Sequence, residues 1–376
     1  MDGPMQTLRD IAYRLLPKPQ PLAAKEKAPH RAAKRLLILS RYPNPTVSYY
    51  LDERAKLAEV PVIMKGLDDP LDAIDNDGLF VIICRYIKQP QLRWLEKRRE
   101  SLAGVAYFVD DDIRAVMTGK EASWPYKFRL MTLAVRPLPR INRLLTHIWV
   151  STEVLAGTLA ATDHRIDILN PMPALPARTS LGAMDEDVKP LRMVYHATGV
   201  HRHEHEFLMP IVKAAMEKHA NLHFEVFASG TLARSWNRQG IDPARMTIVT
   251  PLSWPAYLAR TTQQNADIAL APLLPGKTNA SRADTKRVDI SRLRAAAIFS
   301  RCPTFSRCAV SGEFHVGNTT EEWLAAIDRL ATDKESRLAA RDATRNSIEK
   351  MREYATPEFP GVRLNPSVTP LETATL

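Results

Sequence analysis

Short apolar runs alternate with longer segments of helical periodicity from residue 35 onward. In the first half of the chain the runs are Arg35–Ser40, Val60–Met64, Leu79–Arg85, Gly104–Asp110, Ile148–Thr152 and Arg165–Asn170. The spacing between most of them is roughly 15 to 40 residues, which leaves room for a crossover helix between parallel strands. The pattern therefore predicts βαβ units and a parallel sheet whose strands are buried on both faces.

A second series of the same kind follows a proline-rich interruption. Its runs are Leu191–Ala197, His223–Ala228, Met246–Val249, Asp267–Leu270 and Ala296–Ser300, and residues 320–352 have helical periodicity. We therefore predict an α/β chain with two Rossmann-like, doubly wound domains and a cleft between them, where such sheets bind ligands. The predicted domains span residues 35–170 and 191–352, and residues 171–190 form the linker.

The two ends of the chain are predicted to lie outside these domains. Residues 1–34 form a basic leader, in which apolar residues between Met5 and Leu16 have helical spacing before prolines end the helix. Residues 353–376 are rich in proline and threonine and are expected to be a loosely held tail.

Composition narrows the class of protein. Hydrophobic residues make up 45% of the 376 residues and charged residues 25%, which is typical of a globular protein. Only 14 residues are glycine, and no Gly-x-Gly occurs, so the dinucleotide-binding fingerprint of ordinary nicotinamide dehydrogenases is absent. The three cysteines form no close metal-type pair, which favours a reducing, cytoplasmic location.

The net charge of +10 suggests an anionic partner. Residues 1–35 hold eight basic and three acidic side chains, which is half of the excess. One interpretation is that residues 5–35 lie on an anionic membrane surface, so that the protein is peripheral at the inner face of the membrane. The other is an ordinary helix packed on the body, followed by a solvated linker. Nucleic-acid binding is disfavoured, because no binding module is present.

Several polar segments follow predicted strands. Asp110, Asp111 and Asp112 end one strand and are interpreted either as ligands of a metal or a sugar hydroxyl, or as caps of the next helix. His201 precedes the predicted helix Glu206–Lys218, where an imidazole can donate to an anion; zinc binding by the local histidines is the weaker interpretation.

The segment from Asn279 to Arg292 combines cations and carboxylates. If it is helical from about Ala283, Lys286 and Asp289 lie on one face, as a phosphate-binding cation beside a carboxylate suited to ribose hydroxyls. From this pattern alone, a solvated surface helix is the favoured interpretation of these charges.

Taken together, these segments resemble bacterial glycosyltransferases of the GT-B fold, in the group-1, family 4-like class. The resemblance covers about residues 36 to 350, nearly all of the predicted folded part. The matching segments are Tyr42–Tyr50, Tyr107–Ile113, Trp149–Ala156, Ile168–Pro171, Tyr195–Glu204, Ala269–Asp289 and Trp323–Ile327.

The resemblance implies transfer of a sugar from a nucleotide-sugar donor to a carbohydrate or lipid-linked acceptor, in polysaccharide or glycoconjugate synthesis. It implies no cofactor and no obligatory metal, because basic side chains neutralise the leaving diphosphate. Thr198, Arg282, Lys286 and Asp289 would bind the donor, and Asn44 and Thr46 would lie on the acceptor side. The implied catalytic residues are Asp110, Asp111, Asp112 and His201.

Two departures from the family pattern leave a second function open. Asp289 stands where the wider class carries glutamate, and a glycine usual before the last predicted strand is replaced within Arg294–Ile298. The alternative is a GT-B protein that binds a nucleotide-sugar or acts as a scaffold without catalysis.

Overall fold

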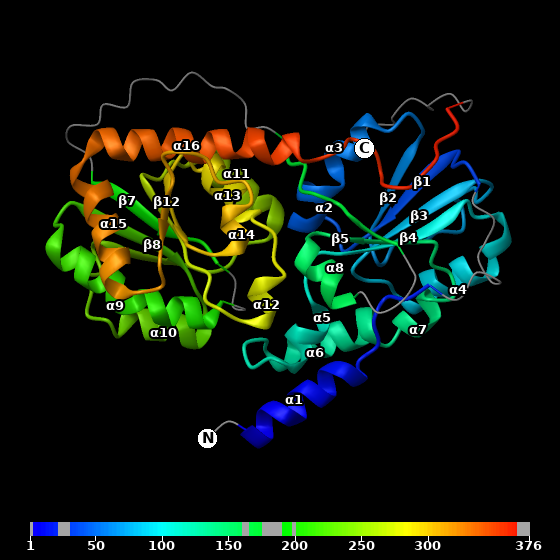
Figure 1. Cartoon of the computed structure of the whole chain (residues 1–376), viewed down its shortest axis with the longest axis horizontal. Coiled ribbons are helices and arrows are strands. Elements are labelled where there is room, and N and C mark those ends of the chain that lie inside the picture. Colours follow the sequence, from blue (N-terminus) through cyan, green and yellow to red (C-terminus); the bar gives the residue numbers. More distant parts are fainter. Residues whose placement is uncertain (1–2, 22–30, 160–164, 175–189, 198–200, 367–376) are drawn as a thin grey trace. The chain divides into compact units, whose positions relative to one another are not determined.

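The computed structural model describes residues 3–21, 31–159, 165–174, 190–197 and 201–366, and these divide into two compact units. Unit 1 consists of residues 1–174, 281–283 and 354–376, and unit 2 consists of residues 175–280 and 284–353. Each unit contains one six-stranded sheet with helices on its faces (Figure 1). Both sheets are parallel throughout, as the apolar runs predicted.

The sheet of unit 1 has the order β2-β1-β3-β4-β5-β6. Its strands are β1 (Arg35–Leu39), β2 (Val62–Lys65), β3 (Leu79–Cys84), β4 (Gly104–Val109), β5 (His147–Val150) and β6 (Ile166–Ile168). The central strands β3 and β4 are buried at every position, which explains why they read as continuous apolar runs rather than as alternating ones.

Helices cover both faces of this sheet. They are α1 (Gly3–Leu15), α2 (Pro45–Tyr50), α3 (Asp52–Leu57), α4 (Gln89–Lys97), α5 (Ile113–Thr118), α6 (Trp124–Leu130), α7 (Leu138–Ile141) and α8 (Glu153–Leu159), with a 3-10 turn at Arg99–Ser101 and a π-helical turn at Met131–Val135. Leu92 of α4, Ile141 of α7 and Leu155 of α8 belong to one core cluster with the inward side chains of the strands.

The sheet of unit 2 has the order β12-β11-β10-β7-β8-β9. Its strands are β7 (Leu191–Tyr195), β8 (Leu222–Phe227), β9 (Met246–Val249), β10 (Ile268–Ala271), β11 (Ala296–Ser300) and β12 (Phe314–Val316). Numbered within the unit, this is the order 3-2-1-4-5-6 of a dinucleotide-binding Rossmann sheet. The chain reaches this topology without the glycine fingerprint, because strand order depends on buried runs and crossovers.

Eight helices surround the second sheet in the described part of unit 2: α9 (Arg202–Lys218), α10 (Gly230–Asn237), α11 (Trp254–Gln263), α12 (Lys277–Ala280), α13 (Lys286–Arg292), α14 (Pro303–Ser306), α15 (Thr320–Thr332) and α16 (Lys334–Glu353). Leu208 of α9, Trp236 of α10 and Trp323 of α15 pack on one face, and Ile290 of α13 packs on the other. The helices predicted at Trp254–Gln263 and over residues 320–352 are confirmed, the latter as two helices.

The leader is attached to unit 1 through α1 and the residues after it. The Tyr13 hydroxyl donates to Asp112 Oδ2 at 2.7 Å, and the Gln20 amide donates to Asn142 Oδ1 at 3.0 Å. At the same time Leu8, Ile11 and Leu15 of α1 are exposed. The helix is therefore docked on the body while much of its apolar face is uncovered, a combination that neither sequence interpretation described.

The prediction of a loose C-terminal tail is wrong for residues 354–366. Phe359 is buried and stacks on Trp149 of β5, with ring centroids 5.6 Å apart, and the Trp149 indole donates to the Pro360 carbonyl. Leu364 forms a bridge with Ala33 beside β1. The segment covers the face of the sheet on which Phe80 and Trp149 lie. Its apolar side chains are therefore held by residues distant in the sequence, which the local composition could not predict.

Within the described residues, no helix combines the length and the apolar character needed to cross a bilayer. The prediction of a linker at 171–190 falls mostly on residues 175–189, which lie outside the described residues.

Candidate functional site

The topological switch point of each sheet gives the first geometric indication of a site. In unit 1 the switch point lies between the neighbouring strands β1 and β3, because β2 lies beyond β1 on one side and β4 to β6 lie beyond β3 on the other. In unit 2 the corresponding pair of strands is β7 and β10. Open parallel sheets bind ligands beyond the carboxyl ends of the strands at such a point. The polar residues that follow these strands are therefore the candidates.

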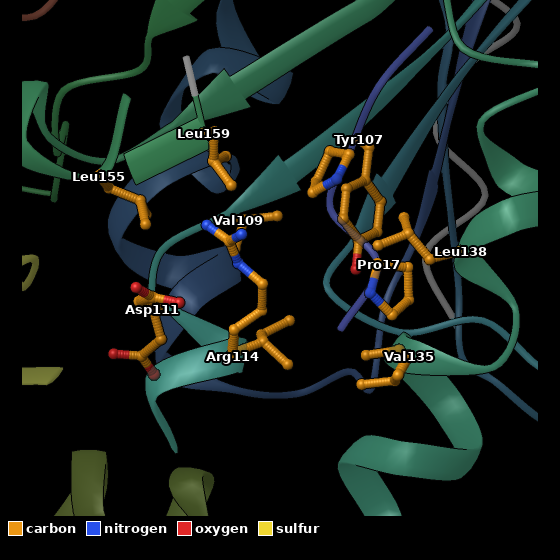
Figure 2. Close-up of a pocket in the computed structure, with 13 residues that line it drawn as sticks. Pro17, Tyr107, Val109, Asp111, Arg114, Val135, Leu138, Leu155 and Leu159 are labelled. Atoms are coloured by element: carbon orange, nitrogen blue, oxygen red, sulfur yellow. The ribbon is translucent and has the colours of Figure 1, made fainter. Parts of the chain in front are cut away.

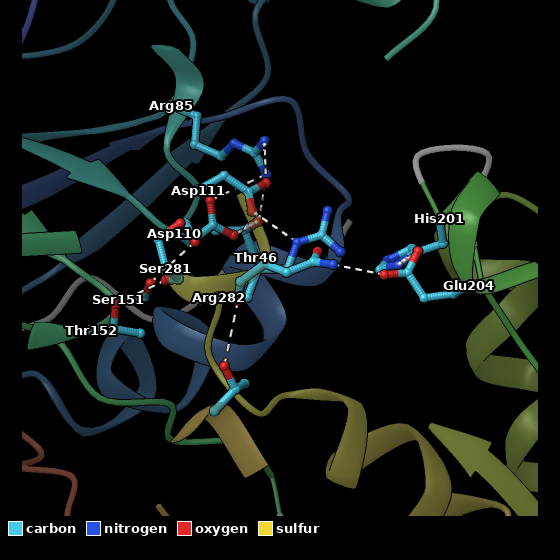
Figure 3. Close-up of polar contacts among 12 residues, drawn as sticks. Thr46, Arg85, Asp110, Asp111, Ser151, Thr152, His201, Glu204, Ser281 and Arg282 are labelled. Atoms are coloured by element: carbon cyan, nitrogen blue, oxygen red, sulfur yellow. Dashed lines mark hydrogen bonds and ion pairs between the residues drawn. The ribbon is translucent and has the colours of Figure 1, made fainter. Parts of the chain in front are cut away.

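In unit 1, Arg85 follows β3 and contacts polar residues that follow β1 and β4 (Figure 3). Its guanidinium lies 3.2 Å from Asp110 Oδ1 and 3.1 Å from Asp111 Oδ2. Asp110 Oδ2 also accepts a hydrogen bond of 2.7 Å from the hydroxyl of Thr46, in the first turn of α2. One cation thus holds two neighbouring carboxylates that would otherwise repel each other.

Burial raises the pKa of Asp110 above its ordinary value. Arg85 and the Thr46 hydrogen bond act in the opposite direction, and the adjacent carboxylate of Asp111 adds to the rise. A carboxyl group with a raised pKa can exchange a proton closer to neutral pH, which is the property of a general base or acid.

Arg282 belongs to the short segment 281–283 that groups with unit 1. Its guanidinium Nε lies 3.7 Å from Asp111 Oδ1, and the Thr152 hydroxyl after β5 donates to the Ser281 carbonyl at 2.9 Å. The structure thus brings together four predicted site residues, Thr46, Asp110, Asp111 and Arg282, with Arg85 among them.

Two other predicted site residues cap helices. The Asn44 side chain accepts a hydrogen bond from the Val47 amide at the start of α2, and the Asp112 side chain accepts one from the Ala115 amide at the start of α5. Asp112 is also buried and accepts from Tyr13. The interpretation of Asp112 as a helix cap is therefore confirmed.

Asp111 and Asp112 also line a mostly apolar pocket in unit 1 (Figure 2). Its empty volume is about 360 Å³, including space open to solvent. The lining combines Pro17 and Pro19 of the leader with Tyr107, Val109, Ile113, Ala134, Val135, Leu138, Leu155 and Leu159, and Asp111, Asp112 and Arg114 are its charged residues. The leader thus forms one wall of a pocket beside the polar cluster.

In unit 2, Lys286 and Asp289 lie beside the carboxyl end of β7. The Lys286 ammonium donates to the carbonyl of His196, the residue after β7, at 2.8 Å and lies 3.3 Å from Asp289 Oδ2. Arg292 reaches the other carboxylate oxygen, Oδ1, at 3.4 Å. The predicted pairing of a cation with a carboxylate on one helix face is thus present in the first turn of α13, which begins at Lys286 rather than near Ala283.

Glu204 links the segment that follows β7 to the segment that follows β10, and these are the two strands of the switch point in unit 2. Its Oε1 accepts hydrogen bonds from the Leu274 amide at 3.2 Å and from Asn279 Nδ2 at 2.7 Å, both of which follow β10. Its Oε2 lies 3.6 Å from Nδ1 of His201. Burial opposes ionisation of Glu204, but the hydrogen bond and charge of His201, together with backbone hydrogen bonds, lower its pKa to about 2.

Thr198 lies outside the described residues, and its predicted donor contact has no structural account. Among the described residues, no group of three or more histidine, cysteine or carboxylate side chains is arranged to hold a metal. The histidines around His201 have separate partners instead, since Nδ1 of His205 accepts from the Trp236 indole inside the core.

Sequence reasoning missed Arg85 and gave no role to Glu204. Arg85 directly follows a strand that is buried at all six positions. A charged residue at the carboxyl end of an apolar run is the same pattern that identified Asp110 as a candidate, so the sequence could have identified Arg85 too. Glu204 had no such signal, because its partners Leu274 and Asn279 are about 70 residues away and are brought to it by the crossover to β10.

No protein-family model matches the sequence, and no curated protein matches it. Solved structures do match. Anabaena Alr3699/HepE in complex with UDP and glucose has a TM-score of 0.52 over 85% of this chain and 97% of that chain, at 11% identity. The trehalose-6-phosphate synthase OtsA has a TM-score of 0.53 over 85% of this chain and 96% of that chain, also at 11% identity.

The chain spans about half of the length of some longer glycosyltransferases. It covers 54% of the pneumococcal O-GlcNAc transferase GtfA, which matches 74% of this chain at 13% identity and a TM-score of 0.48. The two parallel sheets and the full-length matches define an α/β protein of the GT-B fold, which confirms the fold recognised from the sequence.

Proposed function

We propose that this protein is a glycosyltransferase that uses a nucleotide-sugar donor, which unit 2 binds, and an acceptor, which unit 1 binds. The observation that carries the proposal is the pair of Lys286 and Asp289 beside the carboxyl end of β7, at the switch point of a Rossmann-ordered sheet. Lys286 would neutralise the diphosphate, and Asp289 would accept hydrogen bonds from ribose hydroxyls.

The reaction requires charge neutralisation and one proton transfer. An acceptor hydroxyl oxygen bonds to the anomeric carbon while the bond from that carbon to the diphosphate oxygen breaks, and the nucleoside diphosphate leaves with its charge stabilised by cations. The acceptor proton passes to a carboxylate, for which Asp110 and Asp111 are the candidates in unit 1. No metal or cofactor is needed in this scheme, and Arg282 would supply a further cation for the diphosphate.

The first test is donor binding by calorimetry. Lys286→Ala and Asp289→Ala are each expected to weaken nucleotide-sugar binding by about tenfold to a hundredfold, because each removes a charged hydrogen-bonding group. Lys213→Ala is the matched control, since it removes an exposed lysine of α9 whose ammonium is 3.9 Å from Glu217. Unchanged donor affinity in both site variants would contradict the assignment.

The donor nucleotide can be found with a thermal-shift screen of UDP-, GDP-, ADP- and CMP-sugars. Alr3699/HepE is described in complex with UDP and glucose, so UDP-glucose is the first probe. A true donor raises the Tm increasingly with ligand concentration, because it binds only the folded protein.

A second function, nucleotide-sugar binding without transfer, is favoured by the surroundings of Asp289. This carboxylate, one methylene shorter than the glutamate of the wider family, already contacts both Lys286 and Arg292. Release of free nucleoside diphosphate by the purified protein, with or without an added acceptor, would exclude the binding-only function.

We further propose a cytoplasmic protein, peripheral at the inner face of the membrane, that acts on a carbohydrate or lipid-linked acceptor in polysaccharide or glycoconjugate synthesis. The three free cysteines support a reducing location. The basic, partly exposed leader supports contact with an anionic surface.

A further inference from the structure

Five large apolar side chains are exposed on two helices of unit 1. Leu8, Ile11 and Leu15 of α1 are 66%, 49% and 79% exposed, and Trp124 and Phe128 of α6 are 84% and 74% exposed. The spacings of three and four residues put each set on one helix face. Side chains of this size normally gain stability by burial, so five of them exposed on two helices indicate an interaction surface.

The two helices are neighbours, and α1 is held in a defined orientation. Helix α5 contacts both of them, and the charge of Arg9 on α1, after burial, contributes to lowering the pKa of Lys127 on α6. The opposite side of α1 is attached to the body, since the Tyr13 hydroxyl donates to Asp112 and the Arg114 guanidinium lies 4.4 Å from the Tyr13 ring centroid. Docking through Tyr13 leaves the leucine face of α1 uncovered.

Basic side chains accompany this apolar set. The charged residues of the two helices are Arg9, Asp10, Arg14, Lys127 and Arg129, four basic and one acidic. Arg14 is exposed, and Arg9, Lys127 and Arg129 are half-buried. The surface therefore combines leucine, tryptophan and phenylalanine with an excess of positive charge, which is the composition of helices that lie in the interface of an anionic membrane.

We propose that α1 and α6 together form one membrane-docking surface, with Trp124 and Phe128 inserted at the level of the headgroups. We call it the α1–α6 surface and define it as Leu8, Ile11, Leu15, Trp124 and Phe128 with Arg9, Arg14 and Arg129. This deepens the membrane placement proposed above by adding a second helix outside the leader. Pairing with a second copy would bring two positive surfaces together, whereas anionic lipid headgroups complement them.

The experiment is sedimentation of the full chain with vesicles of phosphatidylglycerol mixed with phosphatidylcholine, and with vesicles of phosphatidylcholine alone. We expect binding to the anionic vesicles that falls as salt concentration rises. Trp124→Ala combined with Phe128→Ala is expected to lower the partition coefficient by about tenfold, because two interfacial aromatic anchors are lost. Leu57→Ala with Leu252→Ala is the matched control, since both leucines are exposed on other elements, and it should bind like the parent.

Tryptophan fluorescence gives a second readout. Trp94, Trp149, Trp236 and Trp323 are buried and Trp254 is half-buried, so a blue shift on adding anionic vesicles should come from Trp124. Trp124→Phe should abolish the shift while largely keeping vesicle binding, because phenylalanine also inserts.

Two outcomes would overturn the proposal. One is that the parent chain does not bind anionic vesicles, or that the double variant of Trp124 and Phe128 binds them as well as the parent does. The other is a lipid-free dimer, seen by analytical ultracentrifugation, that the double variant dissociates, which would make a second copy the occupant. Calorimetric donor titration of the same double variant separates this result from the proposed function, because donor affinity should be unchanged.

Discussion

At the scale of single residues, Arg85 is held in place at some conformational cost. Its φ of 65° lies in the left-handed region, which residues other than glycine rarely adopt. Its guanidinium nevertheless reaches both Asp110 and Asp111. Strained backbone that persists at the end of a buried strand points to a side chain whose position matters, here as a positioning residue for two carboxylates.

Replacement of this arginine tests that role. Arg85→Ala is expected to lower the free energy of unfolding by about 3 kcal/mol, because the buried Asp110 then loses its cation and Asp111 keeps only the more distant guanidinium of Arg282. Urea unfolding at neutral pH measures the loss. Arg35→Ala is the control, since it removes an ion pair with the exposed Asp75 and should cost less than about 1 kcal/mol.

The combination of Arg85→Ala with Asp110→Asn should recover part of the loss, because the repulsion between the carboxylates is removed. Equal losses in Arg85→Ala and Arg35→Ala would show that the cluster is not electrostatically coupled.

Arg294 is the second described residue other than glycine with a positive φ, 55°. It follows α13 at the position where helices commonly end with glycine, and the resemblance also expected a glycine just before this strand. The replacement therefore changes side-chain chemistry while the backbone keeps the left-handed turn. This departure from the family pattern is not by itself a sign of an altered fold.

At the scale of elements, burial determined what the sequence could predict. Eleven of the twelve strands in the described residues follow from apolar runs. The runs are most complete in β3 and β4, because strands covered on both faces must be apolar throughout. The missed strand, β12, has only three residues, Phe314–Val316, and carries a histidine in the middle. The segment 354–366 was also missed, since it packs against residues far away in the sequence, such as Trp149 and Ala33.

That C-terminal segment should contribute measurably to the stability of unit 1. Phe359→Ala is expected to lower the free energy of unfolding by about 3 kcal/mol, because it leaves a cavity against Trp149. Tyr354→Ala is the control in the same segment, since Tyr354 is 53% exposed and its removal should cost little. Chemical unfolding followed by the fluorescence of the buried tryptophans compares the two, and equal losses would contradict the packing role.

At the scale of the whole molecule, the two units have different sheet orders and different charge arrangements. Unit 2 contains two buried glutamates, Glu204 and Glu225, whose pKa values are each lowered to about 2 despite burial. For Glu225 the lowering comes from hydrogen bonds with His196 and Arg260. Unit 1 instead contains Asp110, whose pKa burial raises.

Unit 2 should therefore be the acid-sensitive unit. The folded-state pKa of Glu204 is below that of the unfolded chain, so its contribution is fully present above about pH 4.5 and is lost as the pH falls toward 2. At pH 3 the free energy of unfolding of the parent should be about 2 kcal/mol lower than at neutral pH because of protonation of Glu204.

Urea unfolding of the parent and of Glu204→Gln at pH 7 and pH 3 measures this loss. The variant should be less stable than the parent at pH 7 but should change less between the two pH values. Glu217→Gln on the exposed side of α9 is the control and should follow the parent. An identical pH dependence in parent and Glu204→Gln would contradict the assignment.

The sequence by itself determined the α/β class, the parallel strands, the two-part organisation and the pair of Lys286 and Asp289, because each depends on local runs or on residues one helical turn apart. Only the tertiary structure decided which polar residues meet. Arg85 with Asp110, Glu204 with Asn279, and α1 beside α6 join segments far apart in the chain, and such contacts follow from strand order and crossover packing rather than from any local pattern.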